Sequence, residues 1–485
     1  MSSALYAAAP PAPADWITGL DLAMTIGGLD GPPAGLLDVI DPATEQVVAR
    51  SPVTDAAGAE QAILAAHAAF PDWSRTAWSA RRALLEAFAR KLESRQDPLS
   101  FLLTYETGKP LRNALSEVLA GVAYVRTIAA QVLPDRDYAK VGGGVARLEQ
   151  RPLGVAAAIA PWNGPVVLAL AKVANALLAG DTLVLKPSPF TPLTALYMGR
   201  LARELFPPGV FNVVIGDGEV GSVLTAHPLV AKVSFTGSTV TGRLIAAAAA
   251  PTLKRLTLEL GGNDAAILMP DADLDHAVPF IFAIAFAGAG QFCAGIKRLY
   301  VHADLHDEVR DRLVALAEGT RVGSGWNADT TMGPVQNAAQ YARIRDLIED
   351  ARQSGGRILT GGPIDNQPGF FLRPAIVEGL GHGARLVDEE QFGPALPIIP
   401  FSRSEDAVAM ANRDEYGLGG SVWTRDLDAG VALARQLEVG TAWVNQHGAF
   451  SAALPMPFAR QSGLGMDYAE FGVAEHSRMM LINPA

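Results

Sequence analysis

The sequence predicts an α/β protein with a Rossmann-like, doubly wound domain, a second α/β domain and a small separate β element. First, short apolar runs typical of strands alternate with helical stretches every ~25 to 30 residues between residues 154 and 260. Second, a similar series follows from residue 265. Third, 485 residues exceed what one hydrophobic core holds, so more than one domain is expected.

The first series predicts a parallel sheet whose strands are joined by helices. Strands are expected at residues 155–160, 182–186, 210–215, 232–236 and 256–260. Helices are expected at residues 166–178, 191–205 and 239–249, with another that begins near Glu219. Gly180 and the pair Pro207 and Pro208 follow the first two helices, and these residue types commonly end helices. Sheets of this kind bind ligands at the carboxyl ends of their strands.

The second series predicts another α/β layer, which begins after Gly261 and Gly262. Strands are expected at residues 265–268, 299–302, 420–424 and 441–445, and helices at 274–287, 305–317 and 428–437. Residues 134–151 are polar and Gly-rich and predict a protruding hairpin, and residues 479–482 predict an extra strand. The expected domains are 1–133 with 153–261, 262–465, and the β element 134–152 with 466–485.

Charge and hydropathy exclude several classes of partner. The net charge of −11 would repel nucleic acid and anionic membranes. Residues 153–171 and 277–296 are uncharged and approach membrane-spanning length, but their Ala, Gly and Pro content favours burial in a protein core. Residues 1–16 contain no basic residue and three prolines, so they predict a short flexible tail rather than a signal peptide.

A single cysteine, Cys293, further limits the chemistry of the chain. It can form no intramolecular disulfide, and no thiolate cluster is available to bind a metal, so no metal site is expected. These properties favour a reducing, cytoplasmic compartment.

Two β–α turns could hold the phosphates of a dinucleotide. The segment GDGEVG, from Gly216 to Gly221, has the G-x-G-x-x-G spacing, although a plain turn explains it equally well. The segment FTGSTVTG, from Phe235 to Gly242, also presents small residues at a helix start. Two adjacent turns of this type make a dinucleotide site more credible than either turn alone.

Three side chains are candidates for catalysis. Cys293 lies in GAGQFCAGIKR, where flanking glycines leave amides free to stabilise an oxyanion and nearby cations favour a thiolate. Glu259 ends an apolar strand before two glycines, a position suited to a general base. Asn163, in APWNGP, could donate to an oxyanion. The simpler alternatives are an inert buried cysteine, a carboxylate that faces water and an asparagine that closes its own turn.

With these residues in place, the chain resembles the aldehyde dehydrogenase superfamily from about Trp16 to Asn483. The resemblance rests on eight motifs in order: PWNGP (161–165), LKPSPFTP (185–192), FTGSTVTG (235–242), LELGG (258–262), GQFCAG (290–295), EEQFGP (389–394), AWVN (442–445) and QSGLG (461–465).

The resemblance implies an NAD(P)-dependent enzyme that oxidises a small-molecule aldehyde to the acid. Cys293 would be the nucleophile, Glu259 would activate the hydrolytic water, and the Asn163 amide with the Cys293 amide would form the oxyanion hole. Cofactor-binding residues would be Trp162, Lys186, Ser188, Gly216, Gly221, Phe235, Gly237, Ser238, Glu390 and Phe392. The resemblance also implies that the GDGEVG turn is not the main phosphate-binding element. The first domain would bind NAD or NADP, the second would carry catalysis, and the β element would build a homodimer or homotetramer.

Departures from the family pattern refine the expected specificity. Asn263 stands where LELGGK is common, Pro455-Met456-Pro457-Phe458 replaces PFGG, and Arg460 replaces a lysine. Pro189 replaces a glutamate that many NAD-dependent members carry, which predicts a relaxed choice with NAD slightly favoured.

The expected substrate pocket contains small and apolar residues and no arginine. Its members would be Gly164, Leu168, Ala171, Phe286, Phe292, Phe450 and Met456. This set predicts a bulky, apolar or aromatic aldehyde. Two other functions remain open from the residues alone: a thiol esterase without redox chemistry, and a catalytically silent binding protein.

Overall fold

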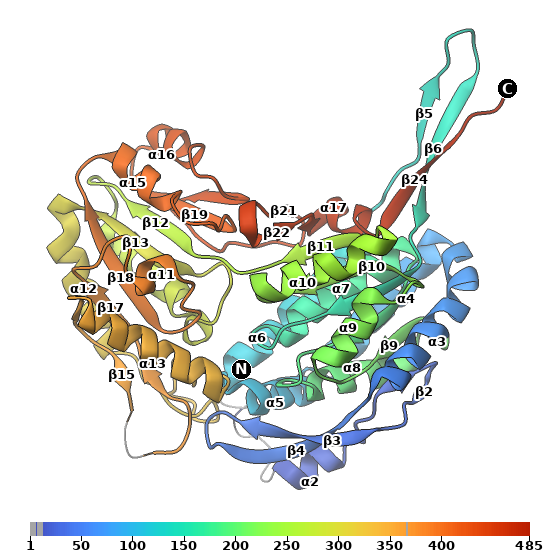
Figure 1. Cartoon of the computed structure of the whole chain (residues 1–485), viewed down its shortest axis with the longest axis horizontal. Helices are drawn as coiled ribbons and strands as arrows, with labels where there is room; N and C mark the ends of the chain where they lie inside the picture. Colours follow the sequence, from blue (N-terminus) through green and yellow to red (C-terminus); the bar gives the residue numbers. More distant parts are fainter. Residues whose placement is uncertain (1–5, 7–12, 365–366) are drawn as a thin grey trace.

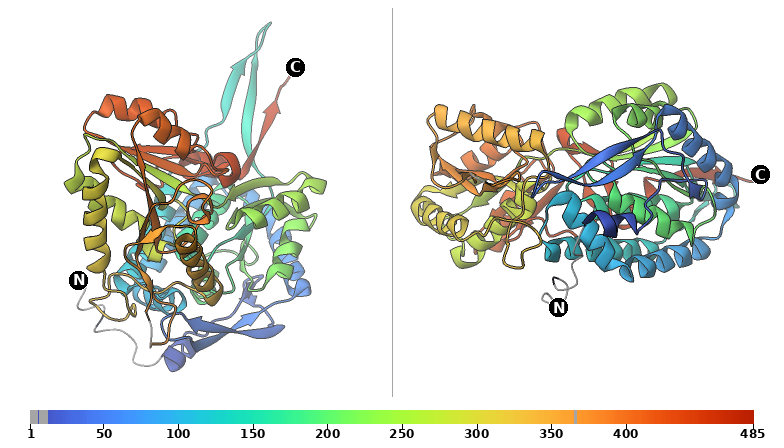
Figure 2. Two further views of the ribbon diagram at one scale, coloured as in Figure 1. Left: turned by 60° about the vertical axis from the view of Figure 1, so that its left-hand side comes forward. Right: turned by 90° about the horizontal axis from the view of Figure 1, so that it is seen from below.

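The computed structural model describes Tyr6, residues 13–364 and residues 367–485. Two α/β bodies lie side by side, and a β hairpin projects from the first of them (Figure 1). In Figure 2 the left view shows the same projecting hairpin, and the right view shows the two bodies side by side. The predicted α/β class is therefore confirmed.

The first body is built on a sheet with strand order β2-β1-β9-β8-β7-β10-β11-β22. Strands β7 to β11 are parallel neighbours, as the alternating pattern predicted. Their bounds are β7 (Val155–Ile159), β8 (Thr182–Lys186), β9 (Phe211–Val213), β10 (Val230–Thr236) and β11 (Arg255–Glu259). The remaining strands of this sheet are β1 (Thr25–Ile26), β2 (Leu29–Asp30) and β22 (Gly463–Leu464).

Helices cover both faces of this sheet because successive strand residues point in opposite directions. In β7, Val155 and Ala157 pack with α3 (Ala56–Arg75), α9 (Gly218–Ala226) and α10 (Thr239–Ala249). Ala156 and Ala158 pack into the core on the other face. The helices of that face are α4 (Trp78–Glu93), α5 (Gln96–Thr107), α6 (Leu111–Ala129), α7 (Pro165–Ala179) and α8 (Leu193–Arg203).

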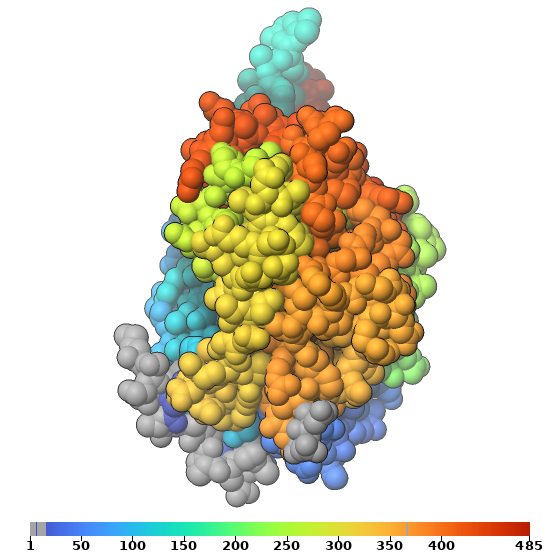
Figure 3. Space-filling view, turned by 90° about the vertical axis from the view of Figure 1, so that its left-hand side faces the viewer, coloured from blue at the N-terminus to red at the C-terminus, as the bar shows by residue number. Residues whose placement is uncertain are grey.

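The second body is built on a sheet with strand order β14-β17-β18-β13-β12-β19-β20. The strands are β12 (Asp264–Leu268), β13 (Ile296–His302), β14 (Arg357–Ile358), β17 (Ala375–Glu378), β18 (Ala395–Phe401), β19 (Gly419–Trp423) and β20 (Thr441–Val444). The main helices are α11 (Leu274–Ala285), α12 (His306–Glu318), α13 (Ala338–Gln353), α15 (Ser404–Ala411) and α16 (Leu427–Ala434). Segments of this body form most of the face seen in Figure 3.

The projecting element is a separate three-stranded sheet. Strands β5 (Arg136–Ala139) and β6 (Val145–Pro152) form the expected hairpin, and β24 (Ser477–Ile482) pairs with β6. The C-terminal strand therefore begins two residues earlier than the sequence indicated. A short helix, α17 (Ala469–Ala474), leads into β24.

Several elements differ from the sequence expectations. No sequence-based expectation covered β17, β18 or helices α3 to α6. Strand β18 contains Pro397 and Pro400, residues that argue against a buried strand. Strand β22 joins the first sheet, although it lies in the segment assigned to the second domain. Of the predicted tail, residues 1–5 and 7–12 lie outside the described residues. The rest is not a free tail, because α2 (Pro13–Thr18) carries Trp16, whose ring meets Phe101 edge-on at 5.7 Å.

Candidate active site

A cavity of about 410 Å³ opens where β10 and β11 end and the two bodies meet. Seven of the predicted site residues line it: Trp162, Asn163, Gly237, Ser238, Cys293, Glu390 and Phe392. Because the carboxyl ends of parallel strands share one edge of a sheet, residues distant in the sequence meet there.

Cys293 lies in the loop between the short helix η2 (Ala287–Gly290) and β13. Gly290 has a φ of +73°, and a Cβ at this position would overlap the carbonyl of Gly393, so the tight approach requires glycine. The Cys293 side chain is 9% exposed, and its Sγ lies 3.1 Å from Oε1 of Glu259. Burial and the Glu259 carboxylate raise the pKa of the Cys293 thiol well above its usual range. The resting side chain is thus a thiol that donates to Glu259.

Glu259 is the last residue of β11, and its side chain is buried. The hydroxyl of Thr236 donates to its second oxygen, Oε2, at 3.0 Å. Burial raises the pKa of Glu259, and the ammonium of Lys172 opposes that rise. The water-facing alternative for this residue is therefore wrong.

Asn163 precedes α7, and its amide points toward the cysteine loop. Its Nδ2 donates to the carbonyl of Gln291 at 3.0 Å, and its own carbonyl accepts from Nζ of Lys109 at 2.5 Å. The side chain therefore does more than close its own turn. Asn163, Glu259 and Cys293 are brought together from three segments of the chain.

Glu390 borders the same cavity from the second body. Its Oε1 accepts from the backbone amide of Gly262 at 3.1 Å, and a Cβ on Gly261 would lie 2.5 Å from Oε2. Burial raises the pKa of Glu390 to about 7. This carboxyl group therefore changes charge near neutral pH, beside the part of the cavity that holds Cys293.

The opposite side of the cavity is formed by the start of α10. Ser238 is the N-cap of this helix, and its hydroxyl accepts from the amide of Thr241 at 3.2 Å. A helix N-terminus with small residues is suited to anionic groups such as a pyrophosphate. Trp162 and Phe392 meet edge-on across the cavity, with ring centroids 5.4 Å apart.

The other predicted cofactor residues do not line this cavity. Lys186 ends β8 and approaches Gly221, and burial lowers the pKa of Lys186 to about 8. A Cβ on Gly216 would overlap Val220, so this glycine is required by the turn into α9. The hydroxyl of Ser188 accepts from the amide of Phe190 at 3.2 Å, and the ring of Phe235 is buried in the sheet core beneath Gly237.

The predicted substrate residues divide into three groups. Phe292, Phe450 and Met456 form an apolar cluster around Cys293. Phe286 instead lines a second cavity of about 320 Å³, which shares Trp162 and Asn163 with the first cavity. In the third group, Gly164 is the N-cap of α7, and Leu168 and Ala171 lie in the first half of this helix.

Ala171 departs most from the expected pocket. It is 3% exposed and belongs to the helical core of the first body, so little of its surface can contact a ligand. A tryptophan placed here would overpack this core rather than obstruct a substrate tunnel. Leu168 is only half-buried, and a Cβ on Gly164 would contact it at 3.3 Å.

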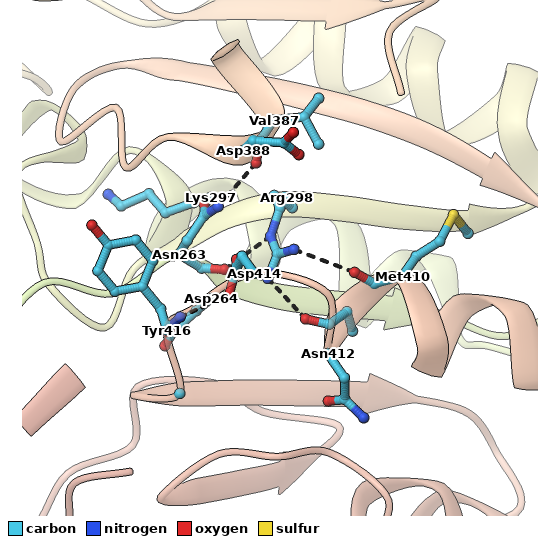
Figure 4. Close-up of polar contacts among 12 residues, drawn as sticks. Asn263, Asp264, Lys297, Arg298, Val387, Asp388, Met410, Asn412, Asp414 and Tyr416 are labelled. Atoms are coloured by element: carbon cyan, nitrogen blue, oxygen red, sulfur yellow. Dashed lines mark hydrogen bonds and ion pairs between the residues drawn. The ribbon is translucent and has the colours of Figure 1, made fainter. Parts of the chain in front are cut away.

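A buried polar network supports the strand that follows Gly262 (Figure 4). The guanidinium of Arg298 donates to the backbone carbonyl of Asn263 at 2.6 and 2.9 Å and pairs with Asp414 at 2.9 Å. The side-chain amide of Asn263 donates to the carbonyl of Val387 at 2.9 Å. This hydrogen bond from Asn263 therefore connects the segment between the two bodies with the segment that precedes Glu390.

Several residues of the site were not expected from the sequence. Thr236 lies within a quoted motif, and Lys172 ends the first uncharged stretch, so both carried a usable signal. Gln340, Arg343 and Tyr416 also line the main cavity, but nothing in their local sequence distinguishes them from surface residues. Across the described residues, no group of three or more His, Cys, Asp or Glu side chains could hold a metal ion. No helix in that part of the chain is long and apolar enough to cross a membrane.

Comparison with known proteins identifies the family. Residues 32–482 match the model of the Aldehyde dehydrogenase family. The aldehyde dehydrogenase LUC3 of a Fusarium species is 38% identical over 90% of this chain and 92% of that protein. The 3-sulfolactaldehyde dehydrogenase of Pseudomonas putida is 38% identical over 90% of this chain and 91% of that protein.

A solved structure shows the same fold. A mutant of aldehyde dehydrogenase C from Pseudomonas syringae, complexed with NAD+ and octanal, superposes with a TM-score of 0.92 at 34% identity. The match covers 96% of this chain and 98% of that one. The chain described here therefore belongs to the aldehyde dehydrogenase family and is an NAD(P)-dependent aldehyde dehydrogenase.

Proposed function

We propose that the chain oxidises an aldehyde through a thiohemiacetal on Cys293 and releases the carboxylic acid by hydrolysis. The observation that carries this proposal is the contact of 3.1 Å between the Cys293 thiol and the Glu259 carboxylate, with the Asn163 amide aimed at the same loop. A buried nucleophile beside a buried base, next to an amide donor, is the arrangement required for acyl transfer.

Glu259 has two tasks in this mechanism. It first accepts the thiol proton, so that the thiolate can attack the aldehyde carbon while the Asn163 side-chain amide and the Cys293 backbone amide hold the oxyanion. After that proton has passed to solvent, the ionised carboxylate takes a proton from the water that attacks the thioacyl group, and the Cys293 thiolate leaves as the acid forms. The family resemblance implies only the second task, and the direct contact between the thiol and the carboxylate supports the first.

The main cavity is suited to the nicotinamide, its ribose and the pyrophosphate of a dinucleotide. Gly261 leaves room for the buried Glu390 carboxylate, and the helix that begins after Ser238 offers an anion site. Ser238 and Gly237 would hold the pyrophosphate, Glu390 the nicotinamide-side ribose and Lys186 the adenine-side ribose, with Trp162 and Phe392 beside the nicotinamide. When bound, the nicotinamide supplies the hydride acceptor for aldehyde oxidation.

Both NAD and NADP are expected to support turnover, with NAD slightly favoured. A carboxylate at position 189 would bind a ribose hydroxyl and repel a 2′-phosphate, and Pro189 does neither. The measurement is kcat/KM for each cofactor with one saturating aldehyde. A preference for NAD greater than about 100-fold, or about 2.7 kcal/mol, would show that another group excludes the phosphate.

The substrate we propose is a bulky, largely apolar aldehyde. The support is the apolar cluster of Phe292, Phe450 and Met456 around Cys293. The relatives do not decide this point, since one is named for sulfolactaldehyde and another was solved with octanal.

An aldehyde panel tests both the reaction and the substrate class. With NAD, reduced cofactor should form, and benzaldehyde or octanal should exceed acetaldehyde and succinic semialdehyde in kcat/KM by at least about tenfold. Hydrolysis of an ester without any formation of reduced cofactor would instead favour the thiol esterase. A preference for the semialdehyde would contradict the apolar pocket but not the oxidation itself.

Assembly into a homodimer or homotetramer is also part of the proposal. In the projecting element, Met479, Leu481, Val141 and Val145 are exposed apolar residues. An exposed apolar strand edge normally requires a partner, and a second copy of the same element would cover it. The lone cysteine, which serves as the nucleophile, fits a reducing compartment such as the cytoplasm.

A further inference from the structure

Tyr468 is held in a backbone conformation that side-chain-bearing residues rarely adopt. It precedes α17 with φ 74° and ψ 162°, a region populated almost only by glycine. The next residue, Ala469, also has a positive φ of 51°. Such a conformation persists only where the surroundings impose it, and it concentrates at functional sites.

Aromatic packing holds the Tyr468 ring beside the nucleophile. Its ring stacks on Phe450 with centroids 6.4 Å apart and planes 12° apart, and it meets Tyr124 edge-on at 5.0 Å. Phe450 in turn meets Phe292 edge-on at 6.1 Å. Tyr468 packs against both the cluster that contains Cys293 and the helical core that contains Ala171. Tyr468 therefore lies between the apolar cluster around Cys293 and the helical core of the first body.

The hydroxyl groups of Tyr124 and Tyr468 differ in their hydrogen bonding. The Tyr124 hydroxyl accepts from Nδ2 of Asn175 at 3.4 Å. The Tyr468 hydroxyl forms no hydrogen bond with the described residues, and the residue is only half-buried. Burial and the Glu259 carboxylate raise the pKa of the Tyr468 phenol well above its usual range. This hydroxyl therefore remains a hydrogen-bond donor throughout the working pH range.

We infer that Tyr468 determines substrate specificity by presenting a flat aromatic wall and one free hydroxyl to the aldehyde. The preferred substrate would be an aromatic aldehyde whose ring carries a hydrogen-bond acceptor, such as a methoxy group. Ring faces and edges favour a planar aromatic group over a saturated ring of similar size. This inference rests on the proposed aldehyde oxidation at Cys293 and narrows its substrate class.

The test compares kcat/KM for four aldehydes: benzaldehyde, 4-methoxybenzaldehyde, cyclohexanecarbaldehyde and hexanal. We expect the unaltered enzyme to prefer benzaldehyde to cyclohexanecarbaldehyde by about fivefold or more, because aromatic pairs add to simple burial. Tyr468→Leu should remove this preference. Tyr468→Phe should keep it, while the advantage of 4-methoxybenzaldehyde over benzaldehyde should fall by about fivefold to tenfold, the effect of one lost hydrogen bond.

Phe471→Leu is the matched control, since this aromatic residue lies three positions further on, in α17, and is 43% exposed. It should leave all the ratios unchanged. Tyr468→Gly relieves the backbone conformation and should fold even if Tyr468→Leu does not, and it should also lose the planar preference.

The outcomes separate this inference from the proposed reaction. If the unaltered enzyme oxidises none of the aldehydes, the proposed function fails. If it oxidises hexanal and benzaldehyde but the ratios do not change in Tyr468→Leu or Tyr468→Gly, only the role of Tyr468 is overturned. If Tyr468→Phe lowers benzaldehyde and 4-methoxybenzaldehyde equally, the hydroxyl has no role in selecting a ring substituent and that part is overturned.

Discussion

Replacing Cys293 with alanine should lower aldehyde oxidation by about 10⁴-fold or more, because no other thiol exists in the chain to form the thiohemiacetal. The measurement is reduced-cofactor formation, both in the steady state and in a single turnover. Neither should be detectable above the background reaction.

The controls must show that only chemistry is lost. Cys293→Ala removes one sulfur atom from a buried position, so the unfolding temperature should change by only a few degrees. Cofactor affinity should stay within about twofold, since none of the proposed cofactor residues is changed. Cys293→Ser preserves the size of the side chain but supplies a far weaker nucleophile, and it should be almost as inactive. Substantial oxidation by either variant would exclude covalent catalysis at this position.

Glu259→Gln should lower steady-state turnover by about 10²-fold to 10⁴-fold, the usual contribution of a general base. The amplitude of the first-turnover burst should persist, because the hydride step needs no hydrolytic water. Its rate should fall at neutral pH, because Sγ of Cys293 donates directly to this carboxylate and glutamine cannot accept the proton. Rapid-mixing absorbance of the reduced cofactor separates amplitude from rate.

The pH dependence of the burst rate tests whether Glu259 must be ionised for Cys293 to react. Both pKa values are raised, so the thiol stays protonated at neutral pH and depends on an ionised Glu259. In the unaltered enzyme the burst rate should rise as Glu259 ionises, and it should be lost as the pH falls through that raised pKa. In Glu259→Gln the rise should move to higher pH and follow the thiol alone. A burst that keeps its rate and pH profile in the variant would return Glu259 to the hydrolytic step only.

Much of the fold could be predicted because local sequence controls local structure. The helix at 239–249 was predicted with its observed bounds, and the strand at 182–186 was also correct, because apolar periodicity and stop signals are local properties. Strand β18 was not predicted, because Pro397 and Pro400 are unfavourable in a buried strand. It forms because it pairs with the neighbouring strands β13 and β17.

The candidate site shows the same division. Cys293, Glu259 and Asn163 could be identified from the sequence, since each is a polar residue in an apolar, Gly-rich setting that matches a family motif. The 3.1 Å contact between the thiol and Glu259 could not, because it depends on how β11 and the loop before β13 meet across the two bodies.

The residues that surround the substrate were the part of the site that could least be predicted without the tertiary structure. The sequence by itself determined the α/β class, the family and the three candidate catalytic residues. Only the tertiary structure showed that Ala171 is buried in the helical core, that Phe286 lines the second cavity and that Tyr468 lies in the cluster that contains Cys293. The physical reason is that the substrate wall is assembled from long-range packing of α6, α7, the cysteine loop and the segment before α17. The surroundings of each wall residue are therefore set by segments that lie far from it in the chain.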